Sequence, residues 1–181
     1  QMCIRDSPSP AARRGSAFHA WLEHRWSDAA LLDLEDLDAI TDLEPDDPDA
    51  PSLEELRRAF TDSSWSGRTP IAVERSVQVQ LGPFMVRGVI DAAFADPDGT
   101  DGTDGVIIVD WKTGHAPPPA RRRALALQLS VYRLAWHQIT GLPLERIRTA
   151  FHYVPDSRTI EVSDHPSVDE ILDHLGEFPS A

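Results

Sequence analysis

Two acidic side chains stand in apolar runs of this chain, and one of them is followed closely by a lysine. One apolar run ends in Asp110, Trp111 and Lys112, and Asp91 lies within a second run, residues 86–94. Because side chains of a strand alternate between its two faces, Asp110 and Lys112 point to one side and Trp111 to the other. Isolated carboxylates in such runs indicate a divalent cation site, since these ions prefer oxygen ligands.

Hydrolysis of a phosphodiester is the chemistry that these residues suit. It needs a divalent cation to polarise the phosphate, a deprotonated water to attack it, and groups that stabilise the charge of the transition state. Asp91 and Asp110 meet the first need, and Lys112 would orient the water or meet the developing negative charge. Spacing alone leaves an ordinary ion pair between Asp110 and Lys112 as an equal alternative.

Length and composition predict one globular domain. The chain has 181 residues, of which 41% are hydrophobic and 26% charged, enough for one core. No apolar run approaches the roughly 20 residues that span a bilayer, so we expect a soluble cytoplasmic protein with no membrane partner. The single cysteine, Cys3, excludes an internal disulfide, a cysteine-based zinc site and a cysteine-ligated iron–sulfur cluster from this chain alone.

The N-terminal residues differ in character from the rest. The chain starts with Gln1, residues 1–7 look like translated sequencing-adapter sequence, and no secretory signal pattern is visible. We therefore expect residues 1–12 to be a non-native or disordered tail and residues 13–181 to form the domain. The chain itself is expected to be a fragment of a longer protein.

The overall charge of the chain argues against a nucleic-acid partner, and its uneven distribution weakens that argument. A net charge of −13 opposes phosphate binding. Much of the acid is concentrated between Asp28 and Glu55, whereas three consecutive arginines, Arg121, Arg122 and Arg123, follow the Asp110 run. We interpret residues 29–68 as an acidic variable insertion containing one short helix.

Periodicity and turn residues predict an α+β fold rather than a strictly alternating parallel one. The first helix is expected to start at an N-cap, Ser16, and a long helix to stop at Gly141. The expected elements are helices over residues 16–26, 53–60, 120–140 and 168–175, and strands over residues 71–81, 86–94, 106–112, 147–155 and 158–162.

Four short motifs occur in the order found in one nuclease family. They are Gly15–His19, Gly88–Asp91, Val109–Gly114 and Gln128–Tyr132. Together they resemble the RecB-type nuclease domain of the PD-(D/E)XK superfamily, and most of all the C-terminal domains of actinobacterial UvrD/RecB-like and AdnAB-like helicase–nucleases. The resemblance implies a restriction-endonuclease-like core, a central mixed sheet of about five strands flanked by helices.

The resemblance also implies a set of metal ligands and a catalytic lysine. By position, His19, Asp91, Asp110 and the backbone carbonyl of Trp111 would bind Mg²⁺ or Mn²⁺. Lys112 would be the catalytic lysine.

Further site residues carry open alternatives. Gln128 and Tyr132 share one helical face and are expected to reach the metal site or a phosphate, the alternative being a polar interruption of a packed helix. Glu74 is interpreted first as a supporting or structural residue, and His115 as a loop residue or a neighbour of the scissile strand. The arginines at 121–123 would contact the DNA backbone or form a solvated cluster.

The function implied is an exonuclease module of an ATP-dependent helicase–nuclease. It would hydrolyse single-stranded DNA delivered by a helicase motor in the same polypeptide or complex, leaving a 5′-phosphate, in DNA end processing and recombinational repair near the bacterial nucleoid. The relatives that hold an iron–sulfur cluster use four cysteines, so no such cluster is expected. The alternative is a catalytically inactive DNA-end-binding or structural module; an enzyme for a small phosphate substrate lacks the Gly-rich loop it would need.

Overall fold

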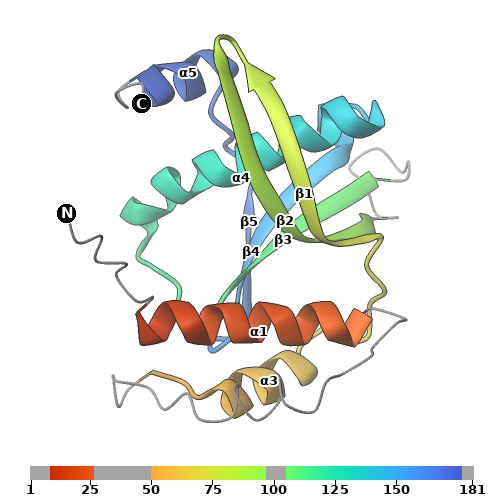
Figure 1. The fold of residues 1–181 in the computed structure, drawn as a ribbon, viewed down its shortest axis with the longest axis vertical. Coiled ribbons are helices and arrows are strands. Elements are labelled where there is room, and N and C mark those ends of the chain that lie inside the picture. The colour runs from red at the N-terminus through yellow and green to blue at the C-terminus, as the bar shows by residue number, and fades with distance from the viewer. Residues whose placement is uncertain (1–8, 27–49, 97–104, 177–181) are drawn as a thin grey trace, which may run out of the picture.

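The protein forms a sheet with helices on both faces (Figure 1). The computed structural model describes residues 9–26, 50–96 and 105–176, with the backbone alone for residues 119–124 and 175–176. The elements in chain order are α1 (Pro10–Trp26), α3 (Leu53–Thr61), β1 (Ala72–Leu81), β2 (Phe84–Asp96), β3 (Gly105–Lys112), α4 (Pro119–Thr140), the 3-10 turn η1 (Leu144–Arg146), β4 (Ile147–Tyr153), β5 (Arg158–Val162) and α5 (Val168–Gly176). None of the helices in these ranges has both the length and the apolar character needed to cross a bilayer.

The five strands form one mixed sheet in the order β1-β2-β3-β4-β5. β3 and β4 are parallel, and every other neighbouring pair is antiparallel. Parallel neighbours need a long crossover, and α4 with η1 provides it. The predicted α+β class with a five-stranded mixed sheet flanked by helices is confirmed.

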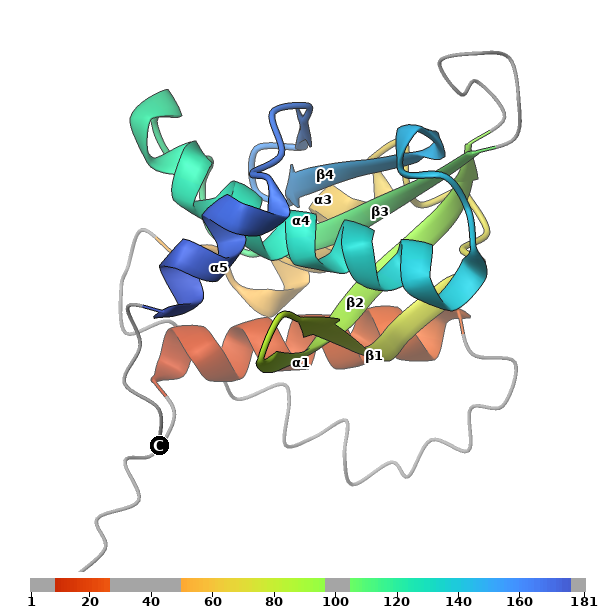
Figure 2. The ribbon, with the colours of Figure 1, turned by 90° about the horizontal axis from the view of Figure 1, so that it is seen from above.

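Two apolar cores hold the helices against the sheet. The core on one face includes Ile108 of β3 and Leu129 of α4, and Ile171 of α5 joins it. The core on the other face includes Phe18 of α1 and Phe60 of α3. Viewed from above, α1 and α4 lie on either side of the β1–β2 hairpin (Figure 2).

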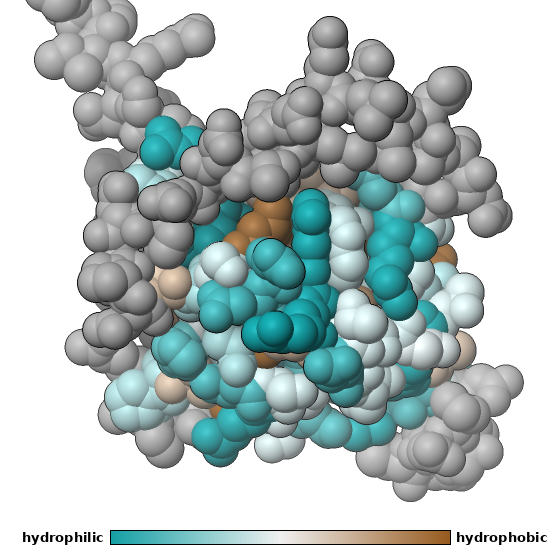
Figure 3. Space-filling model, turned by 90° about the horizontal axis from the view of Figure 1, so that it is seen from below, coloured by the Kyte–Doolittle hydropathy of each residue, from teal (hydrophilic) through white to brown (hydrophobic). Residues whose placement is uncertain are grey.

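α3 is a packed helix with a strong start signal. Ser52 and Glu55 form a capping box, in which each side chain accepts a hydrogen bond from the other residue's backbone N–H. Leu56 and Phe60 are fully buried, while the described surface seen from below is largely hydrophilic (Figure 3). The predicted insertion over residues 29–68 therefore contributes core residues from position 53 onward, and its residues 29–49 lie outside the described part of the chain.

The first helix starts earlier than predicted. α1 begins at Pro10, six residues before the expected N-cap at Ser16, so that prediction is wrong. The Ser9 hydroxyl accepts a hydrogen bond from the Ala12 N–H at 3.2 Å, while the Ser16 hydroxyl donates to the Ala12 carbonyl. Ser9 is thus the cap, and Pro10 suits the first helical position because its missing N–H would have no partner there. Residues 1–8 of the predicted tail lie outside the description.

The other predicted elements are confirmed to within two residues at each end. The long helix does stop at Gly141, which takes the left-handed conformation with φ 72°. Gly141 donates its N–H to the His137 carbonyl at 2.8 Å. Among the described elements, only η1 was not predicted from the sequence.

Shortening Phe60 tests whether α3 belongs to the core. Phe60→Ala should lower the free energy of unfolding by about 3–5 kcal/mol, because it empties a site with no exposed surface. Urea denaturation followed by circular dichroism measures the change. Arg58→Ala, at an exposed position of the same helix, is the control and should stay within about 0.5 kcal/mol of the parent. A small effect of Phe60→Ala would mean that α3 is a detachable insertion.

Candidate metal centre

The site begins where β2 and β3 part. Their ladder ends at the pair Ala92 and Val109, so the next residues, Asp91 and Asp110, have no backbone bridge between them. The Asp91 side chain replaces the bridge, because its Oδ2 accepts a hydrogen bond from the Trp111 backbone N–H at 2.8 Å. A carboxylate is thereby held between two strands of the sheet.

β1 is distorted opposite the same point. The β1–β2 pairs Val73 with Ala92 and Arg75 with Ile90 flank Glu74 and Asp91, which face each other without a bridge. Glu74 has φ 43°, a left-handed conformation that costs a non-glycine residue about 1–2 kcal/mol.

The alternation of side chains slips by one residue at this place. Ile90 and Ala93, three positions apart, both face the α4 core, whereas Ala92 faces the α1 core. Strict alternation would put Ile90 and Ala92 on the same face. The slip allows Glu74 and Asp91 to converge instead of continuing the regular row.

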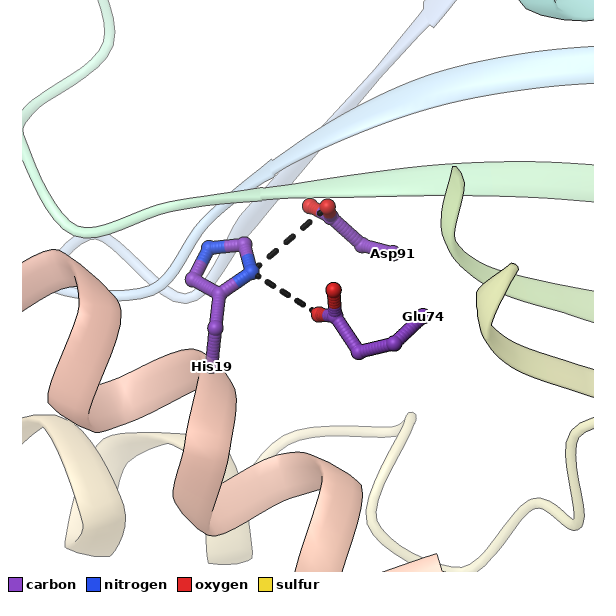
Figure 4. A group of neighbouring side chains, drawn as sticks. All are labelled: His19, Glu74 and Asp91. Carbon is purple, nitrogen blue, oxygen red and sulfur yellow. Dashed lines mark hydrogen bonds and ion pairs between the residues drawn. The ribbon is translucent and has the colours of Figure 1, made fainter. Parts of the chain in front are cut away.

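His19 approaches these two carboxylates from α1. The neighbouring Phe18 is fully buried and fixes the rotation of the helix. His19 Nδ1 lies 3.2 Å from Glu74 Oε1 and 3.5 Å from Asp91 Oδ1 (Figure 4). One ligand atom from each of the three residues falls within 4.8 Å of the others, an arrangement that could hold a metal ion.

Asp110 and Lys112 form a second group beside the first. Lys112 Nζ lies 2.6 Å from Asp110 Oδ2, which confirms that the two side chains share one side of β3. Gln128 of α4 donates from Nε2 to Asp110 Oδ1 at 2.9 Å and to the Tyr132 hydroxyl at 3.1 Å. Asp110 is therefore held on both oxygens, by an ammonium and by an amide.

Burial and mutual repulsion disfavour the ionised forms of Asp91 and Asp110. Burial raises the pKa of Asp91 to about 7, and the charge of Asp110 adds to the rise. His19 and the Trp111 N–H act in the opposite direction without cancelling it. Burial likewise raises the pKa of Asp110, although Lys112 opposes the rise. An imidazole beside carboxylates whose ionised forms are disfavoured in this way suits a divalent cation, which would stabilise both carboxylates in the ionised form.

Comparison with known proteins agrees with this geometry. The sequence pattern of the PD-(D/E)XK nuclease superfamily matches residues 2–177 of this chain. This chain belongs to that superfamily. The segment Asp110-Trp111-Lys112 has the acid-X-lysine pattern for which the superfamily is named. No curated protein matches this PD-(D/E)XK domain.

The PD-(D/E)XK domain brings most of the predicted site residues together. His19 and Asp91 share one group, while Asp110, Lys112, Gln128 and Tyr132 form the adjoining network. Trp111 contributes its backbone N–H to Asp91, and the ligand role of its carbonyl stays a prediction.

From the sequence, Glu74 is interpreted first as a supporting or structural residue, and its contact with His19 at 3.2 Å is compatible with that role. Its carboxylate also belongs to the described group that could hold a metal ion. The signal that could have found it is a lone carboxylate in an alternating strand, the same signal that marked Asp91.

Two further predictions concern His115 and the three arginines. His115 Nδ1 lies 2.6 Å from Asp156 Oδ1, and Asp156 Oδ2 accepts the Ala116 N–H at 2.7 Å. His115 is thus bound to the loop after β4, in keeping with a loop role. The side chains of Arg121, Arg122 and Arg123 lie outside the described part of α4, and their DNA contact stays a prediction.

The raised pKa of Asp91 predicts how metal-free stability depends on pH. An ordinary Asp titrates near 3.8 and Asp91 near 7, so the folded domain binds the extra proton between these values. The contribution of Asp91 to stability should therefore fall as pH rises from about 4 to 7, by at most about 1.4 kcal/mol per unit. Denaturant titrations in EDTA at pH 5, 6, 7 and 8 measure it. Asp91→Asn cannot ionise and should lose this component; profiles of parent and variant that run parallel would contradict the assignment.

Gly88 explains how Tyr132 reaches the site. A Cβ at Gly88 would lie 2.7 Å from Tyr132 Cε1, so the ring occupies the space of the missing side chain. Gly88→Ala should displace the ring and cost about 1–3 kcal/mol of unfolding free energy, measured by urea denaturation.

A double-mutant cycle separates this contact from a general effect of the added methyl group. In a Tyr132→Ala background most of the cost of Gly88→Ala should vanish, because the clash is gone. Gly67→Ala, where nothing lies within 4 Å of the added Cβ, is the matched control. Equal costs of Gly88→Ala in the two backgrounds would exclude the contact as the cause.

Proposed function

We propose that this domain is a divalent-metal-dependent deoxyribonuclease that hydrolyses phosphodiester bonds. The observation that carries the proposal is the convergence of His19, Glu74 and Asp91 beside the Asp110–Lys112 pair in a chain of a nuclease superfamily. The first three residues, with Asp110, would hold Mg²⁺ or Mn²⁺. A bound cation of this kind polarises a phosphate oxygen and lowers the pKa of a water molecule.

The protein side chains supply the remaining requirements of the reaction. Lys112 is the only lysine in the chain, and its ammonium would donate a hydrogen bond to the attacking water or to the phosphate oxygen that gains charge. Asp110 fixes the position of the ammonium at 2.6 Å. Gln128 fixes the orientation of Asp110, and the Tyr132 hydroxyl accepts the second N–H of the same amide. These two α4 residues would thus position the reacting groups.

The acidic charge of the whole chain favours a role within a larger assembly. A chain with 30 acidic and 17 basic residues repels DNA overall, so a partner or further domain would supply most of the affinity. We therefore propose an exonuclease module acting on a single strand delivered by a helicase motor, in DNA end processing and recombinational repair in the bacterial cytoplasm. The chain has one cysteine, and no iron–sulfur cluster is part of the proposal.

Cleavage of labelled DNA tests the proposed activity. The parent domain with Mn²⁺ should degrade a 5′-labelled single strand, and EDTA should abolish the reaction. Asp110→Asn and Lys112→Met should each lower the rate at least about 100-fold, because each removes a charge at the reacting centre. Asp173→Asn, an exposed position on α5, makes the same chemical change away from the site and should leave the rate unchanged.

Metal binding provides a second readout on the same proteins. Glu74→Gln should weaken Mn²⁺ binding at least about tenfold in a calorimetric titration, since it replaces a carboxylate ligand by a neutral amide. A parent that binds Mn²⁺ but cleaves no DNA would favour the inactive DNA-end-binding module and overturn the proposed catalysis. Equal cleavage by the parent and Asp110→Asn would exclude this site as the catalytic one.

A further inference from the structure

The outer part of the β1–β2 hairpin has one face that no described helix covers. The hairpin rises away from α1, which crosses near its base (Figure 1). Val77, Val79 and Leu81 turn to the α4 core, so alternation turns their neighbours to the opposite side. The residues on that side are Ser76, Gln78, Gln80, Met85, Arg87 and Val89, and all six are exposed. A shallow hollow of about 590 Å³ lies on this hairpin and is lined in part by Gln78, Arg87 and Val89.

This face leads directly to the candidate metal centre. Its cross-strand pairs are Ser76 with Val89, Gln78 with Arg87 and Gln80 with Met85. The next position inward along the same two strands is Glu74 opposite Asp91. Each step covers two residues, or about 7 Å of strand, so the row extends roughly 20 Å outward from the carboxylates.

The composition of the face contrasts with that of the chain. Net charge is −13 overall, yet these six side chains include one cation, Arg87, and no carboxylate. Three others offer amide or hydroxyl groups. Met85 is 50% exposed and Val89 39%, which places apolar surface beside the polar groups.

We infer that this face binds one strand of DNA and guides it to the metal centre. The inference rests on the proposed nuclease function and adds the path of the substrate. A duplex offers phosphates on its outside and requires several cations, whereas a single strand also exposes base faces and edges. Arg87 would pair with a phosphate, the glutamine amides would bond to phosphates or base edges, and Met85 and Val89 would contact base faces. One cation with two apolar side chains fits a single strand better than a duplex.

Fluorescence anisotropy with a labelled (dT)20 strand tests the inference. Asp110→Asn protein with Mn²⁺ serves as the non-cleaving background. Adding Arg87→Glu, which changes the charge beside the strand by two units, should weaken binding at least fivefold, and Gln78→Arg, which adds one positive charge, should tighten it about threefold. Arg87→Gln should also reduce the slope of log Kd against log salt by about 0.7, the value for one phosphate contact with a single strand. Val89→Ser should weaken binding without altering that slope.

The controls separate this surface from overall charge and from catalysis. Arg58→Glu makes the same charge change on α3 and should leave the Kd within twofold; an equal effect of the two reversals would overturn the inference. A 20-base-pair duplex should compete at least tenfold less well than unlabelled (dT)20, and equal competition would overturn the choice of a single strand. Absence of (dT)20 binding by the background protein would also overturn the inference. Binding that depends on Arg87 in a parent that never cleaves DNA would refute the proposed catalysis and leave the surface in place.

Discussion

The hydrogen bond from the Trp111 backbone N–H to the Asp91 carboxylate is the interaction around which the site is built. At 2.8 Å it takes the place of a backbone bridge where β2 and β3 part. An unpaired N–H in the middle of a buried sheet would cost about 1–3 kcal/mol, and the Asp91 carboxylate gives this N–H a partner at the point where the two strands separate. The same residue, Asp91, therefore stands at the end of the ladder and supplies the carboxylate of the site.

Keeping two carboxylates in such a place requires strong packing around them. The Trp111 side chain turns away from the acids into an aromatic cluster, with its ring centroid 5.3 Å from that of Phe60 and 5.8 Å from that of Trp65. These contacts hold β3 in place although Asp91 and Asp110 repel each other. The strained backbone of Glu74 is sustained in the same way, by the ladder pairs on both sides of it. The core therefore offsets the cost of burying these two carboxylates side by side.

The two helices that complete the site play different parts. α1 presents His19 to Glu74 and Asp91 from one side of the sheet. α4 holds Asp110 from the other side through Gln128, and Gly88 leaves room for the neighbouring Tyr132 ring. The distortion at Glu74 and Asp91 lets side chains from both faces meet at one point, which a regular sheet would keep apart.

The sequence alone determined the order and type of the elements and the shared side of Asp110 and Lys112, and the family resemblance implied the mixed five-stranded sheet. The elements and the pair follow from local rules: side-chain alternation places the pair, periodicity defines α4, and glycine ends that helix. Tertiary structure decided the rest. The start of α1 depended on a choice between two serines that local preference does not rank, and the burial of α3 depended on the partner it found in α1. Glu74 joins the candidate metal-binding group through tertiary structure: its backbone is left-handed, the alternation of β2 slips beside Asp91, and its carboxylate lies near Asp91 and His19.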